Sequence, residues 1–418
     1  MNSKQRMLKA EIIAIGSELL TPHRTDTNSL WLTERLNSIG IAVQLKTVVG
    51  DDESNLEQTA RDALGRSDII ISTGGLGPTE DDVTRKVFAR VTGRQLRLDY
   101  EILAAIRERF ASRGYQMTPN NERQALIPNG AKALPNPNGT APGLKMDASG
   151  KLVVLLPGPP RENQPMFDDY VMPELEKMSR GARMSKRVVK VTGLGESALD
   201  DLIAPIYGEY TNPVTTILFT DSEVEVHLEA TAAIEARAAE LAGELAYKLE
   251  DKLGEHCYST RGESLEEVIG NRLRLTQYTI ATAESCTGGL IAERITSVAG
   301  SSEYFLGSIV SYSNEAKTAM LGVPTELIER HGSVSGAVAE AMARGIKERT
   351  GATVGVSVTG VAGPGGGTDA VPVGTVYIGL ADDVTNTNRR FTLLGDRHLI
   401  RWRASTAALD MVRRRYLL

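Results

Sequence analysis

The chain has 418 residues, of which 24% are charged and 41% hydrophobic, and its formal net charge is −6 at pH 7. This length is enough for two or three domains with cores of their own, and the composition is that of a soluble globular protein. The acidic balance argues against a surface that neutralises phosphate backbones, so we expect no direct nucleic-acid partner.

Composition also bears on the compartment. The longest apolar runs, such as Leu152 to Leu156, are far too short to cross a bilayer, and the polar N-terminus has no signal-peptide pattern. The chain has only two cysteines, Cys257 and Cys286, which are too few for disulfide bonds to stabilise a protein of this size. Such a low cysteine content is typical of proteins in a reducing environment. We therefore expect a cytoplasmic protein without a membrane partner. The five histidines are scattered and predict no zinc site.

The first segment, residues 1 to 178, alternates strand and helix patterns. Its order of elements predicts a parallel sheet that is covered by helices on both faces. Ligands of such sheets bind at the carboxyl ends of the strands. The expected elements, in chain order, are the strand Glu11 to Ile15, the helix Asp26 to Ile39, the strand Ile41 to Val49, the helix Glu53 to Gly65 and the strand Asp68 to Thr73.

Three of these strands end in segments that combine glycine with acidic residues. The segments are Gly16-Ser17-Glu18, Gly50-Asp51-Asp52 and the long loop from Thr73 to Thr84. Glycines let a backbone approach a phosphate closely, and carboxylates can hold a divalent cation or activate water. The alternative is that the acids cap helices and interact with helix dipoles.

The loop Gly-Gly-Leu-Gly-Pro-Thr-Glu-Asp-Asp-Val-Thr resembles the signature of the molybdopterin-binding MoaB/MogA family, as does Pro157-Gly158-Pro159-Pro160. The longer motifs Gly-Ser-Glu-Leu-Leu and Gly-Pro-Thr-Glu-Asp-Asp are more similar to the N-terminal domain of the CinA family. Members of that family are described as hydrolysing ADP-ribose with a divalent metal. The resemblance implies Mg, Mn or Co as the metal and carries the functional acids onto Asp82 and Asp51, to which we add Glu18. The candidate ligand-binding residues of this domain are Thr73, Gly74, Gly75, Gly77 and Asn121, and a surface loop explains Asn121 equally well.

The middle segment, residues 186 to 258, reads as a small α+β unit. A K-homology unit that binds RNA is a possible topology, but it needs a Gly-x-x-Gly loop with basic neighbours. The segment Thr192-Gly193-Leu194-Gly195-Glu196 lacks that spacing and charge. We therefore favour a spacer or dimerisation module, and we expect a homodimer.

The last segment, residues 262 to 418, predicts a second α/β domain. The motif Ala283-Glu284-Ser285-Cys286-Thr287-Gly288-Gly289 follows a strand pattern and opens a helix pattern at Leu290. A hydroxyl at such a turn lies beside unpaired backbone N–H groups, which suit a phosphate or an oxyanion. The pattern alone fits a helix cap equally well.

Further residues of this segment point to chemistry at the same place. Lys317 falls in the first turn of a predicted helix, where the helix dipole disfavours an ammonium, so its pKa could be lowered and the amine could act as a base. The alternative is a solvated surface lysine. The loop Thr359 to Gly367 offers backbone N–H groups to an anion. Arg397 and Arg401 bring cations that could hold a phosphate.

Together these residues are similar to the C-terminal domain of the CinA family and to the stand-alone PncC enzymes. Those enzymes convert nicotinamide mononucleotide to nicotinic acid mononucleotide and ammonia. The resemblance rests on Ala-Glu-Ser-Cys-Thr-Gly-Gly, on Tyr-Ser-Asn-Glu-Ala-Lys and on Ala-Gly-Pro-Gly-Gly-Gly. It implies no cofactor for this domain. The candidate substrate-binding residues are Thr287, Gly288, Gly289, Thr359, Gly360, Gly363, Gly365, Gly366, Arg397 and Arg401.

The mechanism that we expect is a serine–lysine amidase. Neutral Lys317 takes the proton of Ser285, whose oxygen attacks the carboxamide carbon, and Tyr312 orients the lysine or relays a proton. Cys286 is the competing nucleophile, because a thiolate at a helix start would be activated.

The predicted architecture is therefore α/β, with two separate domains of mostly parallel sheets joined by a small α+β middle domain. The expected partners are small nucleotides, namely nicotinamide mononucleotide and ADP-ribose. Two other readings remain. In one, the chain is a nucleotide-binding sensor or scaffold linked to competence or DNA damage, as the family's name suggests. In the other, the first domain handles molybdopterin.

Overall fold

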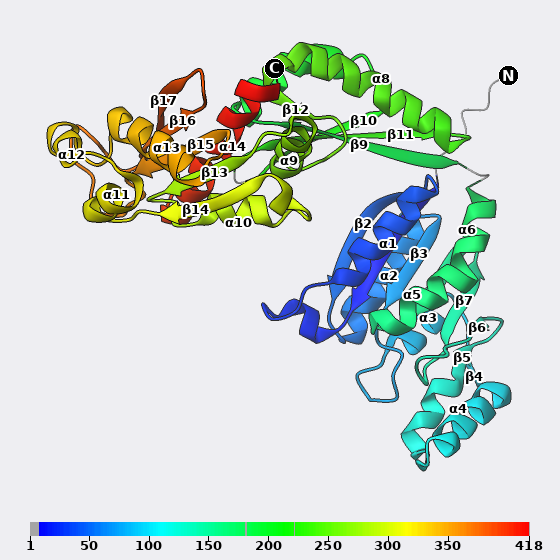
Figure 1. The fold of residues 1–418 in the computed structure, drawn as a ribbon. Coiled ribbons are helices and arrows are strands. Elements are labelled where there is room, and N and C mark those ends of the chain that lie inside the picture. Colours follow the sequence, from blue (N-terminus) through cyan, green and yellow to red (C-terminus); the bar gives the residue numbers. More distant parts are fainter. Residues whose placement is uncertain (1–7, 180–181, 221, 418) are drawn as a thin grey trace. The chain divides into compact units, whose positions relative to one another are not determined.

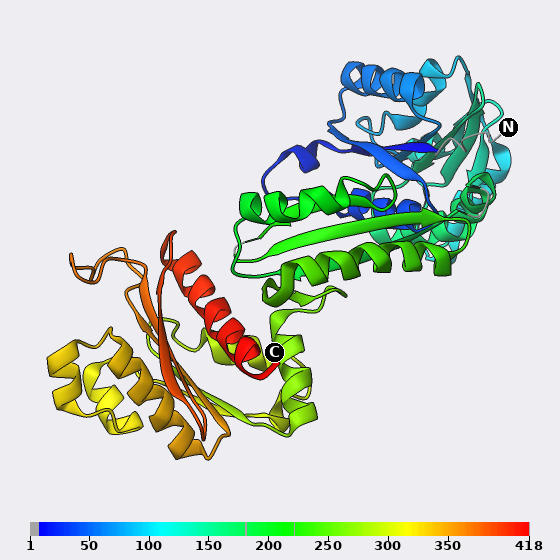
Figure 2. The ribbon, with the colours of Figure 1, turned by 90° about the horizontal axis from the view of Figure 1, so that it is seen from above.

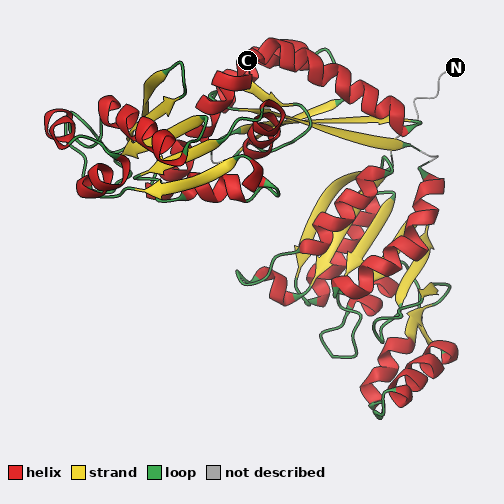
Figure 3. Cartoon of the chain, in the orientation of Figure 1, coloured by secondary structure: helices red, strands yellow, loops and turns green. Residues whose placement is uncertain are grey.

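The structure is a computed structural model that describes residues 8–179, 182–220 and 222–417. Strands and helices alternate along most of the chain, as Figures 1 and 3 show, and the predicted α/β class is confirmed. No helix in the described part is long and apolar enough to span a membrane. The chain divides into two compact units, Met1–Ser185 with Thr231–Ala239 and Lys186–Ala230 with Glu240–Leu418.

The first unit is built on a six-stranded sheet with the order β2-β1-β3-β8-β7-β6. The four strands from β2 to β8 are parallel, as predicted, whereas β7 and β6 extend the sheet in antiparallel fashion. The strands are β1 (Lys9–Ile15), β2 (Ala42–Val49), β3 (Ile69–Thr73), β6 (Lys132–Leu134), β7 (Gly143–Ala148) and β8 (Lys151–Leu156), and a separate pair is formed by β4 (Leu96–Leu98) and β5 (Leu126–Pro128).

Helices cover both faces of this sheet. Successive residues of a strand face opposite sides, so Ile12 packs in the core with Leu32 and Leu36 of α1, whereas Ile13 packs with Leu56 and other residues of α2. This two-sided burial explains why the central strands are apolar throughout. The helical segments are η1 (Ser17–Leu20), α1 (Thr27–Ser38), α2 (Glu53–Arg66), α3 (Thr84–Val91), α4 (Tyr100–Ser112), η2 (Pro119–Ala125), α5 (Pro160–Met166), η3 (Phe167–Val171) and α6 (Met172–Met178).

The middle segment forms a four-stranded sheet with the order β10-β11-β9-β12. Alternate residues of β11, from Val224 to Ala230, are buried and pack with Leu199 and Ile203 of α7 and with Leu245 and other residues of α8. Its elements are β9 (Arg183–Val191), α7 (Glu196–Tyr207), β10 (Val214–Phe219), β11 (Val224–Ala232), α8 (Glu235–Leu253), η4 (Gly254–His256) and β12 (Cys257–Ser259).

The C-terminal segment holds a five-stranded sheet with the order β14-β13-β15-β16-β17. Strand β13 is parallel to both neighbours, and β16 and β17 continue the sheet in antiparallel fashion. Its strands are β13 (Ile280–Glu284), β14 (Phe305–Val310), β15 (Val354–Gly360), β16 (Thr375–Ala381) and β17 (Asn386–Thr392).

Two groups of helices enclose this second sheet. Figure 2 shows α14 (red) and α13 (orange) on opposite sides of the strands. The chain therefore brings the carboxyl ends of β13, β14 and β15 together at one edge between the two helical layers. The helical segments are α9 (Leu265–Thr276), α10 (Leu290–Thr296), η5 (Ser301–Glu303), α11 (Asn314–Leu321), α12 (Thr325–His331), α13 (Gly336–Thr350) and α14 (Arg397–Leu417).

A buried ionic cluster connects the middle segment to the C-terminal one within the second unit. Arg294 of α10 is 4% exposed and pairs with Glu266 of α9. Its guanidinium also lies 4.0 Å from the carboxylate of Glu223, 4.5 Å from the ring of Trp402 and 2.8 Å from the hydroxyl of Thr406. One side chain thus contacts α9, α14 and the turn before β11.

Candidate functional site

A serine and a lysine meet at the carboxyl end of β13. Ser285 directly follows this strand, and its N–H donates to Val358 O at 3.0 Å, which anchors it beside β15. The Nζ of Lys317 lies 3.1 Å from Ser285 Oγ and 3.0 Å from Ser311 O. The lysine is 2% exposed, and burial lowers the pKa of its amine. A neutral amine can therefore act as a base toward the Ser285 hydroxyl.

The position of Lys317 follows from the start of α11. Ser313 caps this helix, since its hydroxyl accepts the N–H of Ala316. Lys317 therefore lies one turn from the helix start, where the dipole also disfavours an ammonium. No carboxylate is among the hydrogen-bond partners of its Nζ in the described part of the chain. The predicted first-turn lysine is thus buried and has no acidic hydrogen-bond partner among the described residues.

Cys286 packs in the core. It is 6% exposed and belongs to the apolar cluster between the sheet, α9, α10 and α14. Burial raises the pKa of the Cys286 thiol to about 11, so the thiol is protonated at neutral pH. This environment favours Ser285 over the competing thiol.

Glu284 has a role that the sequence reading missed. Its carboxylate is fully buried and accepts the N–H groups of Gly289 at 2.9 Å, Ile291 at 3.1 Å and Ala292 at 2.9 Å. The expected ligand-binding N–H of Gly289 is therefore taken by the protein itself. An acid one residue before a turn that opens a helix is the signal that could have revealed this cap.

Arg401, which was predicted to hold a phosphate, contacts the loop after Ser285. Its Nε and one terminal nitrogen both donate to Thr287 O, at 3.3 and 2.7 Å. Arg397 donates to Gly363 O at 2.7 Å and to the Tyr312 hydroxyl at 2.9 Å, which links the glycine loop to the strand end after β14. Tyr312 is 62% exposed and is not among the hydrogen-bond partners of the catalytic candidate lysine in the described chain, so the structure gives no support to its predicted orienting role.

The loop after β15 divides into packed and open glycines. A Cβ at Gly360 would lie 2.8 Å from Thr375 O, and one at Gly363, where φ is +76°, would lie 2.6 Å from a methyl of Val373. These two glycines are required by packing. Gly365 has no heavy atom within 4 Å of such a Cβ, so its backbone is open to a ligand, and Gly366 has a positive φ of +84°. Thr359 is buried, and its hydroxyl donates to Ser333 O at 2.7 Å.

In the first unit, the predicted metal-binding acids do not form one site. Both carboxylate oxygens of Asp82 accept hydrogen bonds within its own loop, from Gly77 N at 2.7 Å and Thr79 N at 2.8 Å. Asp51 accepts the N–H of Ser17 at 2.8 Å. The Glu18 carboxylate folds against Gly16. Among the described residues, no group of three or more acidic, histidine or cysteine side chains could hold a metal. These carboxylates are therefore not gathered into a metal-binding cluster, and the divalent metal stays a prediction.

The glycine loop of this unit lies tightly against β1. Gly74 has a φ of +101°, and a Cβ there would lie 2.0 Å from Ile15 O. A Cβ at Gly75 or Gly77 would meet the side chains of Thr84 or Asp82. Thr73, at the end of β3, is buried. Close packing thus accounts for these glycines without a ligand.

Two other side chains hold the surroundings of this loop. Arg85 is 5% exposed and donates to the carbonyls of Leu76 and Gly77, and burial lowers the pKa of its guanidinium to about 10. The sequence reading missed it. Asn121 is buried and forms a capping box with Thr118, so its side chain serves the fold of η2.

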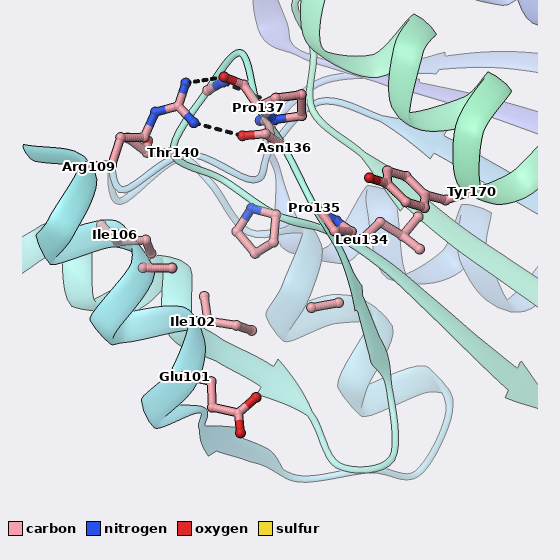
Figure 4. A pocket seen from close by; sticks show the side chains of 14 residues that line it. Glu101, Ile102, Ile106, Arg109, Leu134, Pro135, Asn136, Pro137, Thr140 and Tyr170 are labelled. Carbon is pink, nitrogen blue, oxygen red and sulfur yellow. Dashed lines mark hydrogen bonds between the residues drawn. The ribbon is translucent and has the colours of Figure 1, made fainter. Parts of the chain in front are cut away.

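Two cavities of the first unit bear on its predicted site. One, of about 220 Å³, is lined by Asp82, Thr79 and Arg123 among others. The other, of about 430 Å³, lies between α4 and the loop after β6 and contains none of the predicted site residues (Figure 4). Arg109 at its end donates to the carbonyls of Asn136 and Pro137. Its mostly apolar wall includes Ile102, Ile106, Leu134, Pro135, Pro137 and Tyr170.

Comparison with known proteins identifies the family. Three family models match: a "Probable molybdopterin binding domain" over residues 11–177, a "Damage-inducible protein CinA KH domain" over 186–259 and a "CinA C-terminal domain" over 262–416. A CinA-like protein of Koribacter versatilis is 47% identical over 98% of this chain and 100% of its own length. One of Kosmotoga olearia is 43% identical over 98% and 99%. The chain belongs to the CinA family.

Solved structures also match parts of the chain. The crystal structure of the protein CinA from Thermoplasma acidophilum is 36% identical and covers 41% of this chain and 98% of its own, with a TM-score of 0.37. The match to the KH model favours the K-homology topology for the middle segment, whereas the spacer or dimerisation role stays a prediction. We had argued against a K-homology topology because the segment lacks the Gly-x-x-Gly loop that binds RNA. There we relied on the loop alone and did not consider the order of elements, which is β9-α7-β10-β11-α8-β12.

Proposed function

We propose that the C-terminal domain deamidates nicotinamide mononucleotide to nicotinic acid mononucleotide and ammonia. The observation that supports this most strongly is the 3.1 Å contact between Lys317 Nζ and Ser285 Oγ, in a buried setting where no carboxylate of the described chain hydrogen bonds to the lysine. An isolated ammonium is disfavoured there, so the base form of the lysine is available at the nucleophile. The family resemblance supplies the substrate, and the geometry supports an amide hydrolase.

In the proposed reaction, one N–H of neutral Lys317 donates to Ser311 O, and its lone pair accepts the Ser285 proton. The serine oxygen attacks the carboxamide carbon and forms a tetrahedral adduct. The resulting ammonium returns the proton to the amide nitrogen, the C–N bond breaks, and ammonia leaves. Lys317 then accepts a proton from the water that attacks the acyl ester. The bond between the acyl carbon and the Ser285 oxygen breaks, Lys317 returns the proton to this oxygen, and the carboxylate leaves. Neutral Lys317 and the Ser285 hydroxyl are thereby restored.

The discriminating experiment compares the two neighbouring nucleophiles. Ser285→Ala should abolish ammonia release from nicotinamide mononucleotide, whereas Cys286→Ala should retain it, because the thiol is buried and protonated. Ammonia and nicotinic acid mononucleotide are quantified together. An active Ser285→Ala variant, or loss of activity only in Cys286→Ala, would reverse the assignment.

For the N-terminal domain we propose ADP-ribose as ligand and hydrolysis of its diphosphate, so that the chain takes part in pyridine-nucleotide salvage. The supporting observation is the 220 Å³ cavity beside the glycine loop, which is lined by Arg123 and Lys86 as well as by Asp82. Because the carboxylates do not gather, we derive no metal-dependent step. A titration with ADP-ribose that follows binding and phosphate release separately tests this proposal. Binding without turnover would favour the sensor or scaffold alternative. Binding of molybdopterin in place of ADP-ribose would favour a molybdopterin-binding domain. A homodimer and a cytoplasmic location remain predictions.

A further inference from the structure

We infer that Glu284 and Arg401 are positioning residues that set the backbone after Ser285 as an oxyanion hole, formed by the N–H groups of Cys286 and Thr287. The inference rests on the proposed amidase function. It assigns Arg401 to the nucleophile loop and not to the substrate's phosphate.

Glu284 fixes the far end of the loop. Its buried carboxylate accepts the N–H groups of Gly289, Ile291 and Ala292. A charged acceptor with several backbone donors is among the stronger arrangements in a protein interior. The start of α10 is therefore held at a fixed distance from the end of β13. Since Ser285 lies between these two anchors, its backbone cannot move independently.

Arg401 fixes the middle of the loop. Its two donors converge on Thr287 O, and this fork orients the peptide plane between Thr287 and Gly288. The N–H of Gly288 donates to Ser285 O at 3.1 Å and closes the turn. Gly288 and Gly289 have φ values of +63° and +95°, a conformation in which side chains are strained, so the turn depends on these glycines.

Two donors remain at the nucleophile. In the described chain, no backbone or side-chain oxygen of another residue accepts the N–H of Cys286 or Thr287. The N–H of the residue after a nucleophile at a strand-to-helix turn is a frequent oxyanion donor. Donors that are held in place before the reaction stabilise the developing charge without reorganisation. The contacts of Glu284 and Arg401 hold the loop that carries these donors from two sides.

Loop positioning and phosphate binding by Arg401 can be separated by kinetics. Arg401 is only partly exposed and uses Nε and one terminal nitrogen on the loop carbonyl. A residue that binds the phosphate of the ground state raises KM when it is lost, whereas a residue that places oxyanion donors lowers kcat. The two roles therefore predict different kinetic signatures.

The test uses Arg401→Lys and Arg401→Gln in the full-length protein, with Arg403→Gln as the matched control on the same helix. Loss of one oxyanion donor lowers kcat by roughly 100- to 1,000-fold in other enzymes, so we expect a fall of at least about tenfold in both Arg401 variants with KM within about twofold. Arg403 donates to Leu394 O, and Arg403→Gln should leave kcat unchanged. A rise in KM with unchanged kcat in the Arg401 variants would overturn the inference and assign Arg401 to the phosphate.

Glu284→Gln supplies an independent variant. It is nearly isosteric but replaces one acceptor oxygen with a donor, so kcat should again fall with little change in KM. Both residues act on one loop, so their effects on kcat should not add. The kcat of the double variant Glu284→Gln/Arg401→Lys should be only slightly lower than that of the more impaired single variant. If the two losses of kcat add in full, the residues do not share a role. The thermal unfolding of each variant is measured alongside its kinetics. If none of these variants folds, both residues serve only the stability of the fold, and the inference is overturned.

A fluorophosphonate probe separates this inference from the proposed substrate. Ser285 Oγ forms a bond to phosphorus, the P–F bond breaks, and the serine proton passes to Lys317, while the phosphoryl oxygen occupies the same hole. We expect slower labelling of Ser285 in the Arg401 and Glu284 variants than in wild type and in Arg403→Gln. If wild type is labelled but releases no ammonia, the proposed substrate fails and the positioning role is still decided by the labelling rates. Unlabelled wild-type Ser285, or equal labelling rates in all variants, would overturn the inference.

Discussion

Replacement of Lys317 by methionine should separate catalysis from stability. The side chain is 2% exposed, and its Nζ hydrogen bonds to Ser285 Oγ and Ser311 O. Methionine has a similar length and fills the same space without a charge. As a general base contributes roughly 100- to 10,000-fold to a rate, we expect kcat for ammonia release to fall by at least about 100-fold.

The effect on the free energy of unfolding should be small at neutral pH. Two hydrogen bonds of about 1 kcal/mol each are lost. On the other hand, wild type must deprotonate the lysine or bury an ammonium when it folds. This lowers its free energy of unfolding by about 1.4 kcal/mol for each unit by which burial lowers the Lys317 pKa, and methionine avoids the cost. The two effects offset each other, and we expect the variant to stay within about 2 kcal/mol of wild type.

The pH dependence gives this prediction a sign. The pKa of Lys317 is lowered from 10.5 in the folded protein, so the unfolded chain binds more protons between the lowered value and 10.5. The contribution of Lys317 to wild-type stability therefore rises with pH across this window and is lost as pH falls through the lowered pKa. Lys317→Met lacks this dependence, so its stability relative to wild type should be most favourable below the lowered pKa and should become less favourable as the pH rises toward 10.5.

Urea unfolding at several pH values and a parallel ammonia assay measure both effects. Lys317→Arg is the matched comparison, because arginine keeps its charge and should lose activity and also stability. The reasoning would be refuted by a Lys317→Met variant that retains the wild-type rate within about tenfold, or that is destabilised most at low pH.

Three further predictions concern the first unit. Gly74→Ala places a Cβ 2.0 Å from Ile15 O at a φ of +101°, and the free energy of unfolding should fall by about 2–4 kcal/mol in urea denaturation. Asp82→Asn turns one acceptor of its loop N–H groups into a donor, so hydrogen exchange in residues 77–82 should accelerate and ADP-ribose binding should weaken; unchanged exchange would contradict the capping role. Glu11→Gln removes a fully buried carboxylate that Arg66 contacts at 2.6 Å, and we expect a loss of about 1.5–3 kcal/mol in urea denaturation.

The sequence predicted much of the scaffold because its hydrophobic periods are local. The helix expected from Asp26 to Ile39 is α1, Thr27–Ser38, and the one expected from Glu53 to Gly65 is α2, Glu53–Arg66. The antiparallel strands β6 and β7 were not predicted, because the register between strands depends on contacts far apart in the chain.

The sequence indicated which residues form the candidate site but not which hydrogen bonds they make with each other. Ser285 and Lys317 were identified by motif resemblance, and the structure brings them to 3.1 Å. That Arg401 contacts a loop carbonyl 114 residues away, and that Glu284 caps the next helix, could not be read from spacing. Residue types indicate which groups can react, whereas the fold decides which of them are already engaged with each other.

The buried guanidinium of Arg294 has a consequence for how this protein can be dissected. Its partners come from α9, α14 and the turn that carries Glu223, so a fragment that begins at the C-terminal domain would leave an arginine in an apolar interior with part of its coordination missing. The middle and C-terminal segments should therefore melt in a single cooperative transition. A protein cut between them would lose the Glu223 contact of Arg294 and should be less stable than the same domain in the full chain.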